Sequence, residues 1–106
     1  MTANQTAEIS PLELKLLLEN DANLFLLDVR EPEEFEEAHL LGATHIPMMQ
    51  VEEHLADIRG AASQADHFVV YCRSGGRSGM ICQLLQDLEV GHPRNLTGGI
   101  LAFQKL

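Results

Sequence analysis

The fold is decided by residues 67–88, HFVVYCRSGGRSGMICQLLQDL, in which an apolar run leads through a glycine-bearing loop into a second, periodic run. The run at 67–71 is rich in β-branched and aromatic side chains, which predicts a strand. Apolar residues then recur at helical spacing between 78 and 88, which predicts a helix with Ser78 as its N-cap. A strand, a tight loop and a helix in this order are typical of an α/β domain.

The rest of the chain alternates strands and helices in the same way. A buried strand is predicted over residues 24–29, because its run is continuously apolar, as in a parallel sheet. A helix is predicted over about 11–19, with Ser10 as N-cap, Pro11 in the first turn and Glu13 completing a capping box. The other predicted elements are a short helix over 32–37, a weak strand over 43–46, a helix over 51–58 that ends at Gly60, a short strand over 94–96 and a last helix through about 104.

The composition is that of a globular domain and argues against several classes of partner. A chain of 106 residues is about the size of one domain, so we expect a single domain over residues 1–106. Sixteen acidic residues against seven basic ones give a net charge of −9, which argues against nucleic acid and an anionic membrane surface as partners. Residues 1–8 are polar, unlike a signal peptide, and no segment approaches the roughly twenty apolar residues of a membrane span. We therefore expect a soluble, cytoplasmic protein.

The loop between the predicted strand and helix has the composition of an anion-binding site. Gly75 and Gly76 allow backbone angles at which successive amide N–H groups point inward. These donors, the positive end of the following helix and the side chains of Arg73 and Arg77 would stabilise negative charge at one point. Cys72 lies at the rim of that cradle, directly after a strand, where its thiolate would be favoured. The loop therefore predicts an active site with Cys72 as the nucleophile.

Together with other segments, this loop resembles the rhodanese-like sulfurtransferases in their single-domain form. Residues 72–78 look like that family's active-site loop, and further matching segments follow in the family's order. Ala38, His45 and Phe103 stand where the family usually has Gly, Asn and Trp, which affects local packing rather than the loop. The further segments are Leu27-Asp28-Val29-Arg30 with Glu34-Phe35, His39-Leu40 with Gly42-Ala43 and Ile46-Pro47, and Asn95-Leu96 with Gly98-Gly99-Ile100 and Ala102-Phe103.

The resemblance implies a fold and a reaction. The fold would be a three-layer α/β/α sandwich around a five-stranded, mainly parallel sheet. A sulfane sulfur donor such as thiosulfate would deliver sulfur to Cys72 and form a persulfide, and cyanide, a thiol or a protein would then remove that sulfur. The implied partners are thus a small sulfur-donor anion and a thiol or protein acceptor, and no cofactor is implied.

The resemblance also implies roles for individual residues. Cys72 would be the nucleophile and the sulfur carrier. Arg77, alone or with Arg73, would bind the anionic donor. Asp28 and Arg30 would be structural, with Arg30 supporting the loop by hydrogen bonding. The residues expected to hold the persulfide and the donor are Arg73, Ser74, Gly75, Gly76, Arg77 and Ser78.

Three other functions remain as alternatives. A phosphatase of the cell-cycle dual-specificity class would share the fold, but its loop has five residues between Cys and Arg, whereas four separate Cys72 from Arg77. A sulfurtransferase for 3-mercaptopyruvate would usually have Gly directly after the cysteine, where Arg73 stands. A carrier module would keep Cys72 and pass sulfur to a protein without turning over small donors.

The remaining chemically reactive residues are given structural interpretations. Cys82 lies on the apolar face of the predicted helix and is expected to be a buried core residue. Asp28 could act as a general base, but an ion pair near the sheet is preferred, and His39 is assigned to local hydrogen bonding. The histidines lack the spacing of metal ligands, so no metal site is expected. A solvated acidic face is expected at Glu31, Glu33, Glu34, Glu36 and Glu37.

Overall fold

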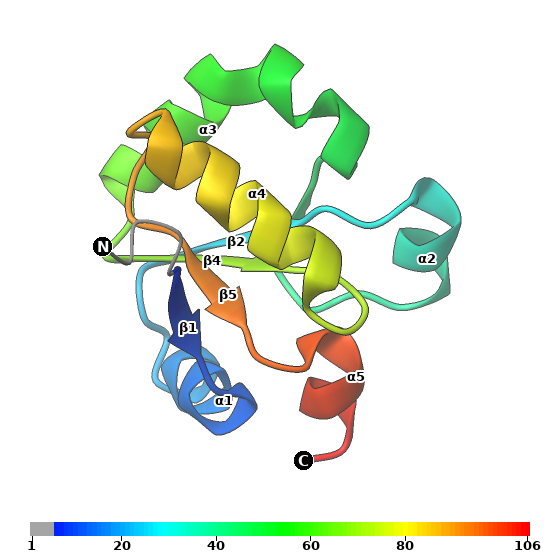
Figure 1. Ribbon diagram of the computed structural model, residues 1–106. Coiled ribbons are helices and arrows are strands. Elements are labelled where there is room, and N and C mark those ends of the chain that lie inside the picture. Colours follow the sequence, from blue (N-terminus) through cyan, green and yellow to red (C-terminus); the bar gives the residue numbers. More distant parts are fainter. Residues whose placement is uncertain (1–5) are drawn as a thin grey trace.

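A computed structural model describes residues 6–106 and shows a five-stranded sheet flanked by helices (Figure 1). The sheet order is β1-β5-β4-β2-β3, and every neighbouring pair of strands is parallel. The segment expected to be polar, residues 1–8, lies outside the described residues in its first five positions. The strands are β1 (Ala7–Ile9), β2 (Leu24–Asp28), β3 (Thr44–His45), β4 (His67–Tyr71) and β5 (Arg94–Leu96).

The helices cover both faces of this sheet, which confirms the predicted α/β sandwich. Helices α3 and α4 lie on one face, and α1 and α5 lie on the other (Figure 1). No helix in residues 6–106 is long and apolar enough to cross a membrane. The helices are α1 (Pro11–Glu19), α2 (Pro32–Glu37), the 3₁₀ helix η1 (Met48–His54), α3 (Leu55–Gln64), α4 (Gly76–Asp87) and α5 (Gly99–Gln104).

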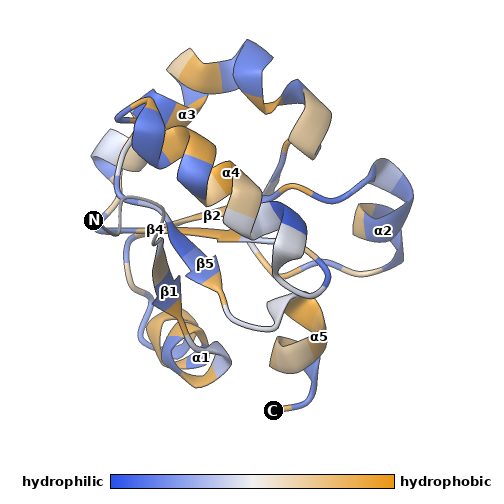
Figure 2. Cartoon of the chain, in the orientation of Figure 1, coloured by the Kyte–Doolittle hydropathy of each residue, from blue (hydrophilic) through white to orange (hydrophobic). Residues whose placement is uncertain are grey.

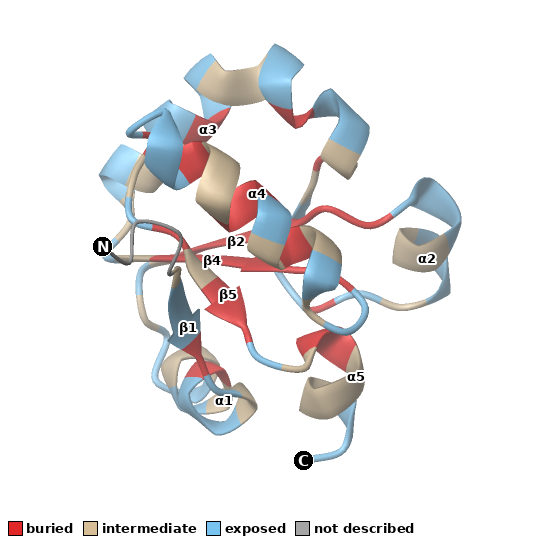
Figure 3. Cartoon of the chain, in the orientation of Figure 1, coloured by how far each residue is buried: buried red, intermediate tan, exposed pale blue. Residues whose placement is uncertain are grey.

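The central strands are buried on both faces, as their continuous apolar runs predict (Figures 2 and 3). Because side chains alternate along a strand, β4 contributes to two separate cores. Val69 and Tyr71 pack in the core with α1 and α5. Phe68, Val70 and Cys72 pack in the core with α3 and α4. The alternation therefore turns Cys72 toward the face of the sheet on which α4 lies.

Two elements differ from the prediction because their structure depends on distant contacts. Strand β1 was not predicted, since only Ile9 of its three residues is buried and the strand is defined by its pairing with β5. The predicted end of a helix at Gly60 was wrong, because α3 continues to Gln64. A side chain at Gly60 would meet nothing within 4 Å, and Ala61 and Ala62 beyond it pack against the core.

The start of α4 also differs from the prediction, in a way that matters for the loop. Gly75, not Ser78, is the N-cap, and its φ of +111° is a conformation that favours glycine. The helix begins at Gly76, so Ser78 lies inside the first turn and is fully buried. Its hydroxyl consequently contacts the sulfur of Cys72 instead of capping the helix. By contrast, Ser10 caps α1 as predicted, through a capping box with Glu13.

Candidate active site

The candidate loop leaves the carboxyl end of β4 and is held from behind by the start of α5. The carbonyl oxygens of Cys72 and Arg73 accept hydrogen bonds from the backbone amides of Ile100 (3.0 Å) and Leu101 (3.1 Å). This contact is so close that a Cβ at Gly99 would collide with the carbonyl of Arg73. The glycine pair Gly98-Gly99 therefore lets the start of α5 approach the cysteine loop closely enough to fix its backbone.

The Cys72 sulfur lies inside this loop and accepts hydrogen bonds. The residue is 1% exposed, and its Sγ is 3.1 Å from the backbone amide of Gly75 and 3.2 Å from Ser78 Oγ. Burial acts to raise the pKa of the Cys72 thiol, but hydrogen bonds from Ser78, Gly75 and Ser74 outweigh it and hold the pKa below its usual value. The loop thus favours a thiolate in a largely dry site, the form in which cysteine is a nucleophile.

Ser78 connects the sulfur to a second buried polar residue, Asn95. The Ser78 hydroxyl is 2.6 Å from Asn95 Oδ1, and Asn95 Nδ2 donates to the carbonyl of Gly75 at 3.1 Å. A serine hydroxyl has one hydrogen, so Asn95 Oδ1 and the Cys72 sulfur compete for it. With a neutral thiol, Ser78 can donate to Asn95 and accept from the thiol; with a thiolate, its hydrogen can turn to sulfur. Asn95 was missed as a site residue, although it belongs to a segment that matches the family.

Arg77, expected to bind an anion, is paired with a carboxylate of α2. Its Nη1 is 2.7 Å from Glu34 Oε1, and its Nη2 is 3.0 Å from Glu34 Oε2. The hydrogen bond from Arg77 is the largest of the influences that lower the pKa of Glu34, which falls to about 2. The placement of Glu34 on a solvated face was wrong, since its side chain is only 27% exposed. These two residues are far apart in sequence, and no local pattern links them.

Arg73 differs from Arg77 in being exposed and unpaired. Within residues 6–106 it takes part in no ion pair, and it lies beside a pocket of about 270 Å³. Ser74 and Gly76 are also exposed on the loop. This pocket next to the loop is lined by Arg30, Glu34, Glu37, Ala38, Arg73, Ile100, Leu101 and Gln104.

Asp28 and Arg30 form a buried ion pair below this pocket. Arg30 Nη2 is 2.7 Å from Asp28 Oδ2, and the two side chains are 5% and 0% exposed. Arg30 Nη2 also donates to the carbonyl of Ala38 at 2.6 Å, which fixes the end of α2. The ion pair preferred for Asp28 is present. In the described part of the chain, Arg30 has no hydrogen bond to the cysteine loop, and its bond to Ala38 lies at the end of α2, the helix that carries Glu34.

Cys82 is a buried core residue, as predicted. It lies on the buried face of α4 and is fully buried, and burial raises the pKa of its thiol to about 12. Neither Cys82 nor Cys72 forms a disulfide. A thiol with this pKa is almost entirely protonated near neutral pH, so the surroundings favour a thiolate at Cys72 rather than at Cys82.

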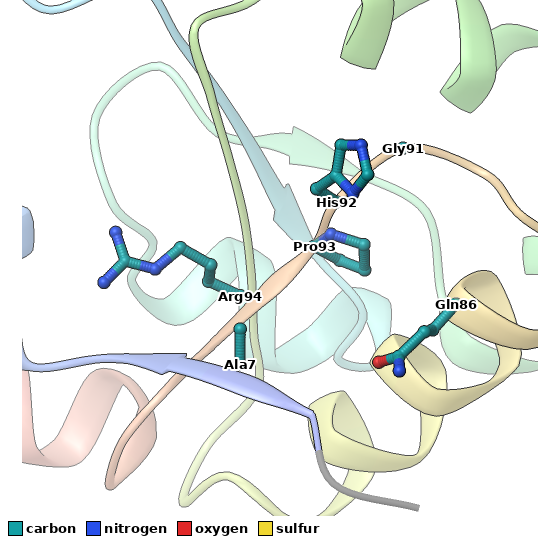
Figure 4. Close-up of a pocket in the computed structure, with 6 residues that line it drawn as sticks. All are labelled: Ala7, Gln86, Gly91, His92, Pro93 and Arg94. Atoms are coloured by element: carbon teal, nitrogen blue, oxygen red, sulfur yellow. The ribbon is translucent and has the colours of Figure 1, made fainter. Parts of the chain in front are cut away.

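A larger pocket of about 490 Å³ lies at the opposite edge of the sheet, where β1 and β5 begin (Figure 4). Figure 4 shows the side chains of Gln86, His92 and Arg94 at this pocket, and neither cysteine is among its lining residues. Parallel sheets bind ligands at the carboxyl ends of their strands. The cysteine loop at that end is therefore the better candidate. The lining residues of this larger pocket are Ala7, Gln86, Gly91, His92, Pro93 and Arg94.

Comparison with known proteins agrees with the fold. The chain belongs to the family of rhodanese-like domains, whose pattern it matches over residues 10–106. It is 36% identical over 97 residues to "Putative sulfurtransferase YtwF" of Bacillus subtilis, covering 92% of this chain and 89% of that protein. It is also similar to the crystal structure "Human Single Domain Sulfurtranferase TSTD1", with a TM-score of 0.78 and 27% identity over 95% of this chain and 97% of that one.

Two other relatives have more specific names. "Thiosulfate sulfurtransferase PspE" of Escherichia coli is 33% identical over 72 residues, which cover 68% of this chain and 67% of that protein. "Putative sulfur carrier protein YrkF" of Bacillus subtilis is 36% identical over 84 residues, 79% of this chain. The aligned region spans only 43% of YrkF, so that relative is considerably longer than the matching domain.

Proposed function

We propose that this rhodanese-like sulfurtransferase carries a sulfane sulfur as a persulfide on Cys72. The observation that carries the proposal is the cradle around the Cys72 sulfur, with the Gly75 amide at 3.1 Å and the Ser78 hydroxyl at 3.2 Å. These donors stabilise negative charge on sulfur. Both the Cys72 thiolate and the persulfide formed on it carry such a charge. A buried thiol without these contacts would have its pKa raised and would be inert.

The reaction consists of two displacements at sulfur. In the first, the Cys72 thiolate attacks the sulfane sulfur of thiosulfate, a new S–S bond forms, and the old S–S bond breaks with its electron pair leaving on sulfite. In the second, cyanide or a thiolate attacks the outer sulfur of the persulfide, and the Cys72 thiolate leaves. No electrons enter or leave the system, so no cofactor is required, and the two half-reactions give ping-pong kinetics.

Thiosulfate is the proposed donor because the loop offers cations and backbone donors to a small inorganic anion. Arg73 is exposed and unpaired among the described residues, and Arg77 stands at the start of α4. The relative named a thiosulfate sulfurtransferase supports the same donor. An arginine directly after the nucleophile suits such an anion better than a keto acid, and the four residues between Cys72 and Arg77 make a smaller ring than a phosphate loop needs.

The test is the intact mass of the protein after incubation with thiosulfate and removal of excess donor. We expect the added mass of one sulfur atom on the wild type and on Cys82→Ser, and none on Cys72→Ser. Addition of cyanide should remove the extra mass and release one equivalent of thiocyanate. An unmodified wild-type protein with several sulfur donors, or a sulfur that persists in Cys72→Ser, would contradict the proposal.

A second candidate is a sulfur carrier that delivers its persulfide to a protein. The similarity to a putative sulfur carrier protein favours this version, and the chemistry at Cys72 would be the same. Turnover distinguishes the two. A sulfurtransferase for small molecules releases thiocyanate continuously from thiosulfate and cyanide, whereas a carrier turns over slowly and transfers its loaded sulfur quickly to a protein thiol.

A further inference from the structure

Glu34 already binds Arg77, the arginine that the loop would offer to an anion. Both oxygens of its carboxylate bind the Arg77 guanidinium, at 2.7 and 3.0 Å, in a bidentate pair. Such pairs are stronger than single contacts and use donors that a sulfonate group would also use. The pair leaves Arg73 as the unpaired cation of the loop within residues 6–106.

The position of Glu34 is fixed by the short helix that carries it. Glu34 Oε1 also accepts from the backbone amide of Glu31 at 3.0 Å, in a capping box at the start of α2. The other end of α2 is held by the bond from Arg30 to the carbonyl of Ala38. Glu34 and Glu37 both line the pocket beside Arg73, so two carboxylates lie next to the exposed cation of the loop.

From this arrangement we propose that Glu34 is a specificity-determining residue that selects sulfur donors by charge. The inference rests on the proposed function and concerns how the same site chooses its donor. A dianion such as thiosulfate must compete with the carboxylate for Arg77 and is repelled by it twice as strongly as a monoanion, because Coulomb energy is proportional to ligand charge. Glu34 therefore lowers the preference of the site for dianionic donors such as thiosulfate, relative to donors with a single negative charge.

Methanethiosulfonate is the matched monoanionic donor. It carries the same sulfane sulfur as thiosulfate, with a methyl group in place of one oxyanion. The Cys72 thiolate attacks that sulfur, the bond from sulfane sulfur to sulfonyl sulfur breaks, and the electron pair leaves on methanesulfinate. Atoms and charges balance as they do with thiosulfate. A change in the ratio of the two rates between wild type and a charge variant therefore reports the effect of charge, because the intrinsic difference between the donors cancels.

Glu34→Gln is the appropriate variant, and Glu33→Gln is its control. Glutamine can keep the capping contact with the Glu31 amide, because capping boxes accept Gln as well as Glu. Glu33 is exposed on the same helix and does not line the pocket, so it reports the effect of removing one charge from α2. In Glu34→Gln we expect the ratio of kcat/KM for thiosulfate to that for methanethiosulfonate to rise about threefold at low salt. The ratio should stay unchanged in Glu33→Gln.

A binding measurement tests the same selection without any sulfur transfer. Sulfate and methanesulfonate, which carry no sulfane sulfur, should each slow alkylation of Cys72 by iodoacetamide when they occupy the loop. In Glu34→Gln, we expect the sulfate concentration needed for half protection to fall about tenfold and the methanesulfonate concentration about threefold. Added salt should shrink both changes, because it screens exposed charges.

The two measurements separate the failure of this inference from the failure of the proposed function. If no donor loads Cys72 but the protection constants shift as expected, the sulfur chemistry is wrong and the charge selection stands. If Glu34→Gln weakens sulfate protection, or improves both anions equally, Glu34 orients Arg77 rather than competing for it, and the inference is overturned. Glu34→Asp retains the charge and should keep the wild-type ratio; a ratio like that of Glu34→Gln would also contradict charge selection.

Discussion

At the scale of single residues, Ser78 is the main hydrogen-bonding partner that lowers the pKa of Cys72. Ser78 is fully buried, and its Oγ contacts both the Cys72 sulfur and Asn95 Oδ1. Ser78 is also the largest single source of the hydrogen bonds that lower the pKa of the thiol. Helical spacing predicts Ser78 as a helix cap, and the family resemblance implies that its backbone amide holds the persulfide. The turn at Gly75 instead places Ser78 inside the helix, with its hydroxyl against the sulfur.

Ser78→Ala should therefore raise the pKa of Cys72. Removing a hydrogen bond to a charged group at a buried site reduces the thiolate fraction at neutral pH, and we expect alkylation by iodoacetamide at pH 7 to slow about tenfold. The measurement is the pH profile of the alkylation rate. Ser74→Ala is the control, because Ser74 is exposed and contributes through its backbone, which the substitution retains. An unchanged profile in Ser78→Ala would show that the backbone amides alone stabilise the thiolate.

At the scale of elements, the sequence predicted those whose signals are local. The apolar runs of β2 and β4 and the Ser10 cap of α1 are properties of neighbouring residues, and the structure confirms them. Strand β1 exists through its pairing with β5, which lies more than eighty residues away. The Glu34–Arg77 pair and the Asn95 contact also join distant segments. The charge or polarity of such a residue does not indicate its partner. Only the structure shows that these residues lie at the site.

The contact between α5 and the cysteine loop gives a prediction at this scale. Gly99 has a φ of +64° and lies against the Arg73 carbonyl, so Gly99→Ala should push α5 away from the loop. We expect it to lower the free energy of unfolding by about 2 kcal/mol, measured by urea denaturation, and to slow persulfide formation. Gly60→Ala is the matched control: its Cβ meets nothing in α3, and it should raise the free energy of unfolding by about 0.5–1 kcal/mol. Similar losses in both variants would contradict a specific role for Gly99.

At the scale of the whole molecule, the net charge of −9 makes acid an informative variable. Moderate acidification protonates exposed carboxylates and relieves repulsion between them. Glu34 behaves differently, because its pKa is about 2 in the folded protein and near 4.5 when it is unpaired. A carboxyl group with a depressed pKa stabilises the fold above its unfolded pKa, and this contribution is lost as the pH falls through the folded value.

The contribution of the Glu34–Arg77 pair should consequently disappear in a defined pH window. At pH 7 we expect Glu34→Gln to be less stable than the wild type by about 1 kcal/mol or less, since the pair is partly exposed and screened by solvent. Between pH 4.5 and about 2 the two proteins should converge in free energy of unfolding, measured by urea denaturation at fixed ionic strength. Glu33→Gln keeps the Glu34–Arg77 pair, to which Glu33 does not belong, and should not show this convergence. A difference between Glu34→Gln and the wild type that persists at pH 2 would mean that packing around α2, rather than the charge of Glu34, links that helix to the cysteine loop.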